Sequence, residues 1–313
     1  FPPEVNAPAS RTFEHCREWV KEQDCEVTVI TCAPNFPRGR VFDGYKNKLF
    51  QVEIVEGIRV IRVWSFITSN EGTLKRILDY LSFMVMATIA SCFVRKVDVI
   101  VATSPQFFTA CAGYLVSIAK RAPWIFELRD IWPESIKAVG AMEESVFIRF
   151  LERLELFLYR KASRIISVTN AFRNSLGERG IETQKIEVIT NGVDTTCFSP
   201  LPKDQDLLTQ LGLSERFVAG YIGTHGLAHG LDTILDAAHA EQRRRPDSRL
   251  QFLLLGDGAE KARLKARASE LDLSNVTFVD SVSKAEVVRY WSILDVSIVH
   301  LKKTPLFESV IPS

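Results

Sequence analysis

A glycine-rich loop joins an apolar run to a helical pattern in the stretch Tyr221-Ile222-Gly223-Thr224-His225-Gly226-Leu227-Ala228-His229-Gly230-Leu231-Asp232. A strand, a glycine loop and a helix N-terminus in that order form an anion site. The backbone N–H groups point into the gap, and the helix dipole adds about half a positive charge there. The stretch therefore predicts a bound phosphate, held beside the two histidines of the loop.

The same order of elements is predicted along most of the chain. Runs rich in β-branched residues predict strands at 26–31, 58–63, 97–103, 124–128, 164–169 and 186–190, and then at 217–222, 250–255, 276–279 and 296–301. Helical patterns lie between them, at 8–22, 74–95, 107–121, 145–161, 171–179, 231–244, 259–271 and 284–292. Strands that alternate with helices indicate an α/β fold with parallel sheets covered on both faces.

Turn residues and prolines separate two complete series of strands, at Asn191-Gly192-Val193-Asp194 and again at 198–202. We therefore expect two Rossmann-like domains, 1–194 and 195–313, whose sheets face across a cleft. The chain opens at Phe1 in what reads as a loop, and it stops at Ser313 just after a predicted strand. From this we expect a fragment that lacks a first strand and part of the C-terminal domain.

Composition limits the function. The chain has 313 residues, of which 46% are apolar and 25% charged, which is enough for two packed cores. The net charge of +1 provides no general field for nucleic acid, so we expect no nucleic-acid partner. The six cysteines form neither a CxxC pair nor a cluster spaced to bind metal, which is typical of reduced cytosolic cysteines.

Two more turns follow the next predicted strands, at Gly256-Asp257-Gly258 and Asp280-Ser281-Val282. Open α/β sheets bind ligands at the carboxyl ends of their strands, so the three turns together predict a nucleotide-sized shelf. A plain turn explains Gly256-Asp257-Gly258 equally well. The glycines from Gly223 to Gly230 are spaced G-x-x-G-x-x-x-G rather than G-x-G-x-x-G, which argues against a dinucleotide-binding dehydrogenase.

In the first domain, charged and aromatic residues directly follow a predicted strand, in Glu127-Leu128-Arg129-Asp130-Ile131-Trp132-Pro133-Glu134. Such a loop at a carboxyl edge predicts a site, and a buried Arg–Asp pair that fixes the loop is an equally good explanation. Nearer the start, Pro8 suits a first helical position, with Asn6 or Ala7 as the cap. The small residues there would let a ligand approach the backbone closely.

The predicted helix from Leu74 to Lys96 has no charged residue between Tyr80 and Val94, and basic residues flank that apolar middle. About fifteen apolar residues are too few to span a bilayer of roughly 30 Å. Two explanations stay open: a helix buried in the core, or an element that rests on a membrane surface through apolar and basic groups.

The most specific motif is Val188-Ile189-Thr190-Asn191-Gly192-Val193-Asp194, followed by Phe198 and Pro200. It resembles the interdomain signature of retaining glycosyltransferases of family 4, which have the two-domain GT-B fold. The resemblance covers nearly all of the chain. Within the family, Pro2-Pro3-Glu4 with Arg11, and the stretch from Glu127 to Glu134, resemble the WbuB-like subgroup that builds bacterial surface polysaccharides.

The resemblance implies an enzyme that moves a sugar, N-acetylated amino sugars included, from a nucleoside diphosphate to a polyprenyl-diphosphate-linked glycan. It implies retention of configuration, a UDP-sugar as donor, no metal cofactor, and a place at the cytoplasmic face of the membrane. Domain 1–194 would take the acceptor and domain 195–313 the nucleotide sugar. The implied catalytic residues are Arg129, Asp130 and Glu134. The implied acceptor-binding residues are Pro3, Glu4, Asn6, Ala7 and Arg11. The implied donor-binding residues are Gly223, Thr224, His225, Gly226, His229, Gly256, Asp257, Gly258, Asp280, Ser281, Val282 and Glu308.

The chain departs from the family pattern in the diphosphate loop and beside Asp130. Many members carry an Arg and a Lys in that loop, where this chain has Thr224 or His225 and His229, and many carry a His where Arg129 stands. A nearby dianion favours imidazolium, so we expect the histidines to act as cations and activity to fall as pH rises through their raised pKa.

The family's Glu-x7-Glu pair should begin near Glu308 or Ser309 and end beyond Ser313, so we expect these 313 residues alone to be inactive. Two other classes share the features described so far. A sugar-nucleotide 2-epimerase of the same architecture would bind the same donor, and a nucleotide-sugar-binding protein would bind it without catalysis.

Overall fold

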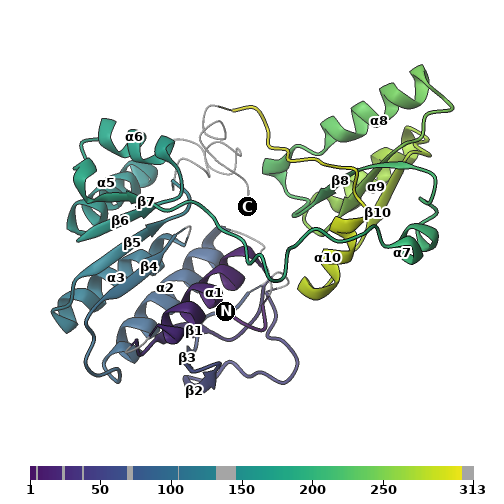
Figure 1. Cartoon of the computed structure of the whole chain (residues 1–313). Helices are drawn as coiled ribbons and strands as arrows, with labels where there is room; N and C mark the ends of the chain where they lie inside the picture. The colour runs from purple at the N-terminus through teal and green to yellow at the C-terminus, as the bar shows by residue number, and fades with distance from the viewer. Residues whose placement is uncertain are drawn as a thin grey trace. The chain divides into compact units, whose positions relative to one another are not determined.

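The computed structural model describes residues 1–4, 6–22, 25–36, 39–68, 73–104, 106–131 and 146–304. The chain divides into two compact units, Phe1–Asn191 and Gly192–Pro312. Each unit is an α/β arrangement in which helices cover strands (Figure 1). The predicted α/β class is therefore confirmed, and the division between the units falls inside the Asn191–Asp194 motif.

The strands of the first unit form two sheets. The larger has the order β4-β5-β6-β7 and is parallel throughout, with β4 at Ile100–Thr103, β5 at Trp124–Leu128, β6 at Arg164–Ser167 and β7 at Ile186–Val188. The smaller has the order β1-β3-β2, with β1 at Thr28–Cys32, β2 at Phe50–Val55 and β3 at Ile58–Val63. Because βαβ crossovers join the parallel strands, the carboxyl ends of β4 and β5 lie side by side.

Strand β2 was not predicted, and it is antiparallel to β3. Glu56 and Gly57 connect the two strands with φ values of 49° and 82°, which is the pattern of a two-residue hairpin turn. The alternation of β2 exposes its apolar residues Phe50, Val52 and Ile54 and turns the polar ones inward. Because the apolar residues of β2 are the exposed ones, its sequence did not indicate a strand with an apolar inner face.

Helices in the described part of the first unit connect or cover these strands (Figure 1). Their bounds are Ala7–Lys21 for α1, Thr73–Ser91 for α2, Phe107–Lys120 for α3, Val146–Lys161 for α5 and Asn170–Glu178 for α6, with a 3-10 turn at Thr183–Lys185. Buried aromatic side chains fill the core between helices and sheet. The rings of Phe126 on β5 and Tyr159 on α5 lie 4.8 Å apart, and Trp124 packs beside Phe126.

The second unit holds one parallel sheet of order β10-β9-β8-β11. Its strands are β8 at Phe217–Ile222, β9 at Leu250–Leu255, β10 at Val276–Val279 and β11 at Val296–Ser297. Its helices are α7 at Gln205–Gln210, α8 at Asp232–Arg244, α9 at Lys261–Glu270 and α10 at Lys284–Ser292. The six-residue α7 was not predicted. The parallel order brings the turns after β8, β9 and β10 to one edge of the sheet, as expected.

Candidate active site

In the first unit, cationic side chains gather around the carboxylate of Glu127, near the carboxyl end of β5. Glu127 Oε1 accepts hydrogen bonds from Arg129 Nε at 3.0 Å and lies 2.8 Å from Arg129 Nη2. Arg11 Nε lies 3.7 Å from the same oxygen, and His15 Nδ1 lies 3.9 Å from it. Two guanidinium groups therefore share one carboxylate oxygen, so these three side chains together carry a net positive charge.

The side chains that carry this excess positive charge are largely buried. The side chains of Arg11, Glu127 and Arg129 are 17%, 10% and 9% exposed. Burial lowers the pKa of Arg11, Glu127 opposes the shift and Arg129 adds to it, but a guanidinium stays protonated at neutral pH. The Nε–H of Arg11 is buried and donates no hydrogen bond within the described residues. The cluster has donors and charge to offer an anionic ligand.

The loop after β5 is held by its neighbours. Ser104, just after β4, accepts hydrogen bonds at Oγ from the backbone N–H groups of Arg129 at 2.8 Å and Asp130 at 3.3 Å. Arg129 Nη1 donates to Asn191 Oδ1 at 2.6 Å. The carboxylate that pairs with Arg129 is thus Glu127, so a buried ion pair is present here, with a glutamate in place of the expected aspartate. Glu134, the third predicted catalytic residue, lies outside the described residues.

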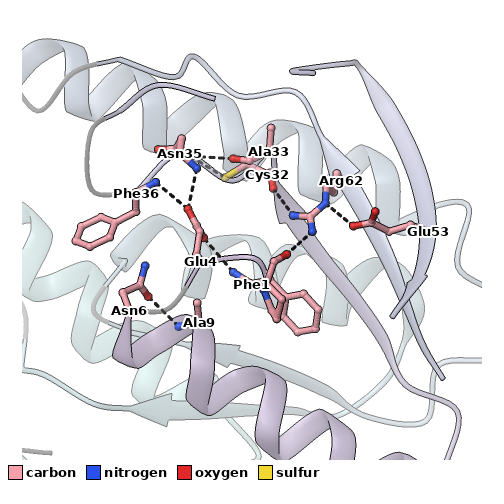
Figure 2. Close-up of polar contacts among 11 residues, drawn as sticks. Phe1, Glu4, Asn6, Ala9, Cys32, Ala33, Asn35, Phe36, Glu53 and Arg62 are labelled. Atoms are coloured by element: carbon pink, nitrogen blue, oxygen red, sulfur yellow. Dashed lines mark hydrogen bonds and ion pairs between the residues drawn. The ribbon is translucent and has the colours of Figure 1, made fainter. Parts of the chain in front are cut away.

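The N-terminal segment packs against the loop after β1 (Figure 2). Glu4 Oε1 accepts hydrogen bonds from the backbone N–H groups of Asn35 and Phe36, both at 2.8 Å. This gives the Glu4 carboxylate a structural contact in addition to its predicted role toward an acceptor. Buried Arg62 donates to the carbonyl of Pro2 at 2.5 Å and to Glu53 at 2.6 Å.

Helix α1 has one of the two predicted caps, and it begins one residue before the predicted Pro8. Asn6 Oδ1 accepts from the Ala9 N–H at 2.9 Å, so Asn6 is the cap, Ala7 the first helical residue and Pro8 the second. Pro3 and Ala7 are both exposed. Of the predicted acceptor-binding residues, Arg11 is the one that the structure places beside Glu127.

In the second unit, the turn after β8 is bonded to the turn after β9. Gly223 N–H donates to Leu255 at 3.0 Å, and His225 N–H donates to Asp257 at 2.9 Å. Gly256 has φ 145°, and a Cβ there would lie 1.8 Å from the Gly223 carbonyl oxygen. Gly258 has φ 156°, and a Cβ there would lie 2.4 Å from the His225 carbonyl oxygen. Both glycines are needed for close contact between the two turns, which is more than a plain turn requires.

Several amides of this loop remain available. The N–H groups of Thr224, Gly226 and Asp232 donate to no acceptor among the described residues. A 3-10 turn at Leu227–His229 and the left-handed Gly230, with φ 57°, lead the chain into α8. Unpaired amides at the start of a helix are the groups that bind phosphate oxygens, so the geometry agrees with the predicted anion site.

The two histidines of the loop lie in surroundings that disfavour their charged forms. His225 is completely buried, neither ring nitrogen has a hydrogen-bond partner in the described residues, and burial lowers its pKa to about 4, with nearby Lys261 adding to the shift. Burial also lowers the pKa of His229. Both imidazoles are therefore neutral at pH 7 without ligand. The expectation that a bound dianion makes them cations stays a prediction.

The third turn is organised by a lysine that the sequence did not single out. Buried Lys261 on α9 donates to the carbonyl oxygens of Gly256 at 2.6 Å and Val279 at 3.0 Å, and to Asp280 Oδ1 at 2.6 Å. Asp280 and Ser281 are exposed, and Val282 is half-buried. Lys261 thus fixes the turns after β9 and β10 to each other, and Glu308 lies outside the described residues.

Comparison with known proteins identifies the chain. Residues 9–192, more than half of its length, match the model of the glycosyl transferase 4-like domain. The chain belongs to this glycosyltransferase family. The predicted family-4 resemblance is thereby confirmed, and the WbuB-like subgroup stays a prediction.

Two curated relatives of this chain are also named as glycosyltransferases. The chain is 25% identical over 287 residues to the putative colanic acid biosynthesis glycosyl transferase WcaI of Escherichia coli K12, covering 89% of this chain and 69% of WcaI. It is 22% identical over 211 residues to the probable glycosyltransferase WbjE of Pseudomonas aeruginosa, covering 67% of this chain and 52% of WbjE. The chain therefore spans about half the length of WbjE.

Solved structures confirm the GT-B fold of this glycosyltransferase. Sucrose-phosphate synthase from Thermosynechococcus elongatus matches with a TM-score of 0.68 and 17% identity, covering 92% of this chain and 69% of that one. Anabaena HepE in complex with UDP-glucose matches with a TM-score of 0.58 and 19% identity, covering 77% of this chain and 60% of that one. At such identities the likeness establishes the fold alone.

Proposed function

We propose that this glycosyltransferase moves a sugar from a UDP-sugar to a polyprenyl-diphosphate-linked glycan in bacterial surface polysaccharide synthesis, with retention of configuration. The observation that carries the proposal is the presence of two different anion-binding arrangements. One offers the permanent cations Arg11 and Arg129 in the first unit, and the other offers the free amides of Thr224 and Gly226 in the second. A reaction between two diphosphate-bearing substrates needs both.

The donor belongs to the second unit in this proposal. HepE was solved with UDP and with UDP-glucose, which supports a uridine nucleotide here, and the relatives' names support a role in polysaccharide synthesis. The bond from the anomeric carbon to the diphosphate oxygen breaks, and a bond from that carbon to an acceptor hydroxyl oxygen forms. Negative charge develops on the departing diphosphate, which takes up the hydroxyl proton. Preorganised amides and the α8 dipole stabilise that charge, so we expect no requirement for a divalent ion.

The acceptor belongs to the first unit. Arg129 would hydrogen-bond the donor sugar or the acceptor phosphate, and Asp130 or Glu134 would orient the acceptor hydroxyl. Replacing Arg129 by Ala or Asp130 by Asn should lower turnover by about 100-fold or more, as loss of a positioning or charge-stabilising group does. Turnover within a few-fold of wild type in both variants would remove these residues from the site.

The decisive experiment, on an intact enzyme that contains both glutamates of the family pair, follows UDP release from a UDP-sugar with and without a polyprenyl-diphosphate-linked glycan. A transferase releases UDP when the acceptor is supplied. An epimerase changes the donor sugar without any acceptor, and a pure binding protein releases no UDP in either case. Running the assay with excess EDTA tests the proposed independence from divalent ions.

An exposed apolar stripe on α2 supports the proposal of a lipid-linked acceptor. Among its described side chains, α2 buries only Ala87, Ala90 and Ser91, so this helix is partly exposed rather than enclosed in the core. Its sheet-facing side packs Phe83 and Met86 against Ile61 and Val63. The opposite side exposes a stripe of apolar residues at helical spacing: Leu78, Val85, Ile89 and, just after the helix, Phe93.

Neighbouring helices extend this surface. Helix α3 packs beside α2 and exposes Leu115 and Ile118, and α5 contacts α3 and exposes Phe150 and Phe157. The same helices and the residues that follow them also carry lysines and arginines: Lys75, Arg76, Arg95, Lys96, Lys120, Arg121, Arg149, Arg153, Arg160 and Lys161. Apolar groups among basic ones fit an anionic lipid surface. No helix within the described ranges is long and apolar enough to cross a membrane.

Flotation with vesicles tests this part of the proposal. Wild type should float with phosphatidylglycerol vesicles and less with phosphatidylcholine vesicles, and the double variant Val85→Asp/Ile89→Asp should float much less. The matched control is Val193→Asp/Leu201→Asp, which places the same charges at two exposed apolar positions of the second unit. Equal flotation of wild type and the α2 variant would show that this surface does not bind lipid.

A further inference from the structure

The segment after β11 lies against the loop that opens α8. The Lys302 N–H donates to the Ala228 carbonyl at 2.9 Å, and His300 Nδ1 lies 2.5 Å from the His229 carbonyl oxygen. A Cβ added at Gly230 would lie 2.9 Å from Lys302 Cγ, so the aliphatic part of the Lys302 side chain crosses the loop at Gly230. Residues distant in sequence thus form one wall of the hollow bordered by Gly226, Leu227 and Gly230.

The loop offers amides but no permanent cation of its own. His225 and His229 are neutral at pH 7 without ligand, because burial lowers their pKa values. A departing diphosphate carries more charge than a few amides can neutralise, so a transfer of this kind calls for a cation nearby. The candidates are the lysines and arginines whose side chains border the loop.

Two of these candidates are already engaged. Arg263, which borders the same hollow, binds both oxygens of Asp232, at 2.9 Å and 2.6 Å, and also Glu260 at 2.6 Å. Lys261 has three acceptors among the described residues. The ammonium group of Lys302, in contrast, has no hydrogen bond or ion pair among the described residues, and its side chain is exposed.

We propose that Lys302 is the cation that binds the donor diphosphate at this loop. The inference rests on the proposed function, because it presumes a nucleoside diphosphate in the second unit. The loop then supplies directed amides, and the segment after β11 supplies the charge. Gly230 serves both parts, since its left-handed backbone opens α8 and its missing side chain makes room for Lys302.

Calorimetric titration of the protein with UDP and with uridine tests the assignment. The variant Lys302→Met should bind UDP about tenfold more weakly than wild type, because a charge-assisted contact to phosphate is lost, and should bind uridine equally well. Lys302→Arg keeps the charge and should retain most of the UDP affinity. The matched control is Lys303→Met, which removes the neighbouring exposed lysine and should leave both affinities unchanged.

Three outcomes separate the possibilities. If wild type and Lys302→Met bind UDP equally well, the role of Lys302 is overturned and the proposed function stands. Equal weakening by Lys302→Met and Lys303→Met shows a general charge effect and also overturns it. Wild type that binds neither UDP nor another nucleoside diphosphate contradicts the proposed function itself. Circular dichroism of each variant confirms that the fold is unchanged.

Discussion

The two arrangements proposed to bind anions in this glycosyltransferase use different physics. Around Glu127, permanent charges are buried together, and Arg11 and Arg129 compete for one carboxylate oxygen. Around Gly223–Gly230 the chain offers backbone amides and neutral histidines, in a loop whose shape depends on glycines. The first should therefore be sensitive to loss of a charge, and the second to loss of close backbone contact.

The largest effect is expected from removing the shared carboxylate. Glu127→Gln leaves two largely buried guanidinium groups without their counter-charge, and breaking a buried ion pair from one side costs about 3–5 kcal/mol. Urea unfolding should show a loss of that size. Glu187→Gln, at an exposed position of β7 in the same sheet, is the matched control and should change little. Similar stability of both variants would mean that the cluster is effectively solvated.

The second unit should respond most to its glycines. Gly256→Ala would bring a methyl group into the Gly223 carbonyl at a backbone conformation that disfavours a side chain, which should cost at least about 2 kcal/mol and abolish UDP binding. Gly192→Ala meets no atom within 4 Å and is the matched control. Urea unfolding and UDP titration check both variants. Normal UDP binding by Gly256→Ala would contradict the close contact between the two turns.

The difference between the regions also explains what the sequence could predict. Several strands are found at the predicted residues, because buried parallel strands read as apolar runs. They are the strands at 58–63, 124–128, 217–222, 250–255 and 276–279. Strand β2 was missed because it exposes Phe50, Val52 and Ile54, and α7 because six residues hardly establish a helical period.

The candidate site was predictable where it depends on chain order and unpredictable where it depends on packing. The turns after β8, β9 and β10 meet because their strands are parallel neighbours. Glu127 was not predicted as the hub of a cluster, because it lies within a strand and its partner Arg11 comes from α1. Lys261 looks like an ordinary surface lysine of a helix, and the neutrality of His225 arises only from its complete burial.

A smaller effect is expected from acid. The pKa of His225 is about 4 in the folded protein and about 6.5 when unfolded, so the unfolded chain takes up the proton first as pH falls. The free energy of unfolding should therefore fall between pH 6.5 and 4, by about 2 kcal/mol from this group. His225→Leu should flatten that part of the profile, which urea unfolding followed by tryptophan fluorescence measures in both proteins. An equal pH dependence in the variant would show that His225 is accessible to protons when folded.

The smallest effect is expected from giving the loop a charge of its own. At pH 7.5 His229 is neutral without ligand, since burial lowers its pKa, whereas a bound diphosphate favours its protonated form. Wild-type UDP affinity should therefore rise as pH falls from 8 to 6, because binding takes up a proton. His229→Lys carries its charge throughout, so it should bind UDP about two- to fivefold more tightly at pH 7.5, with a flatter profile. Titration of both proteins with UDP from pH 6 to 8 measures the two quantities together. Parallel pH profiles of the two proteins would show that His229 does not contact the diphosphate, so that Lys302 would be the only cation beside the amides of the loop. A flat wild-type profile would mean that the loop binds the diphosphate without taking up a proton.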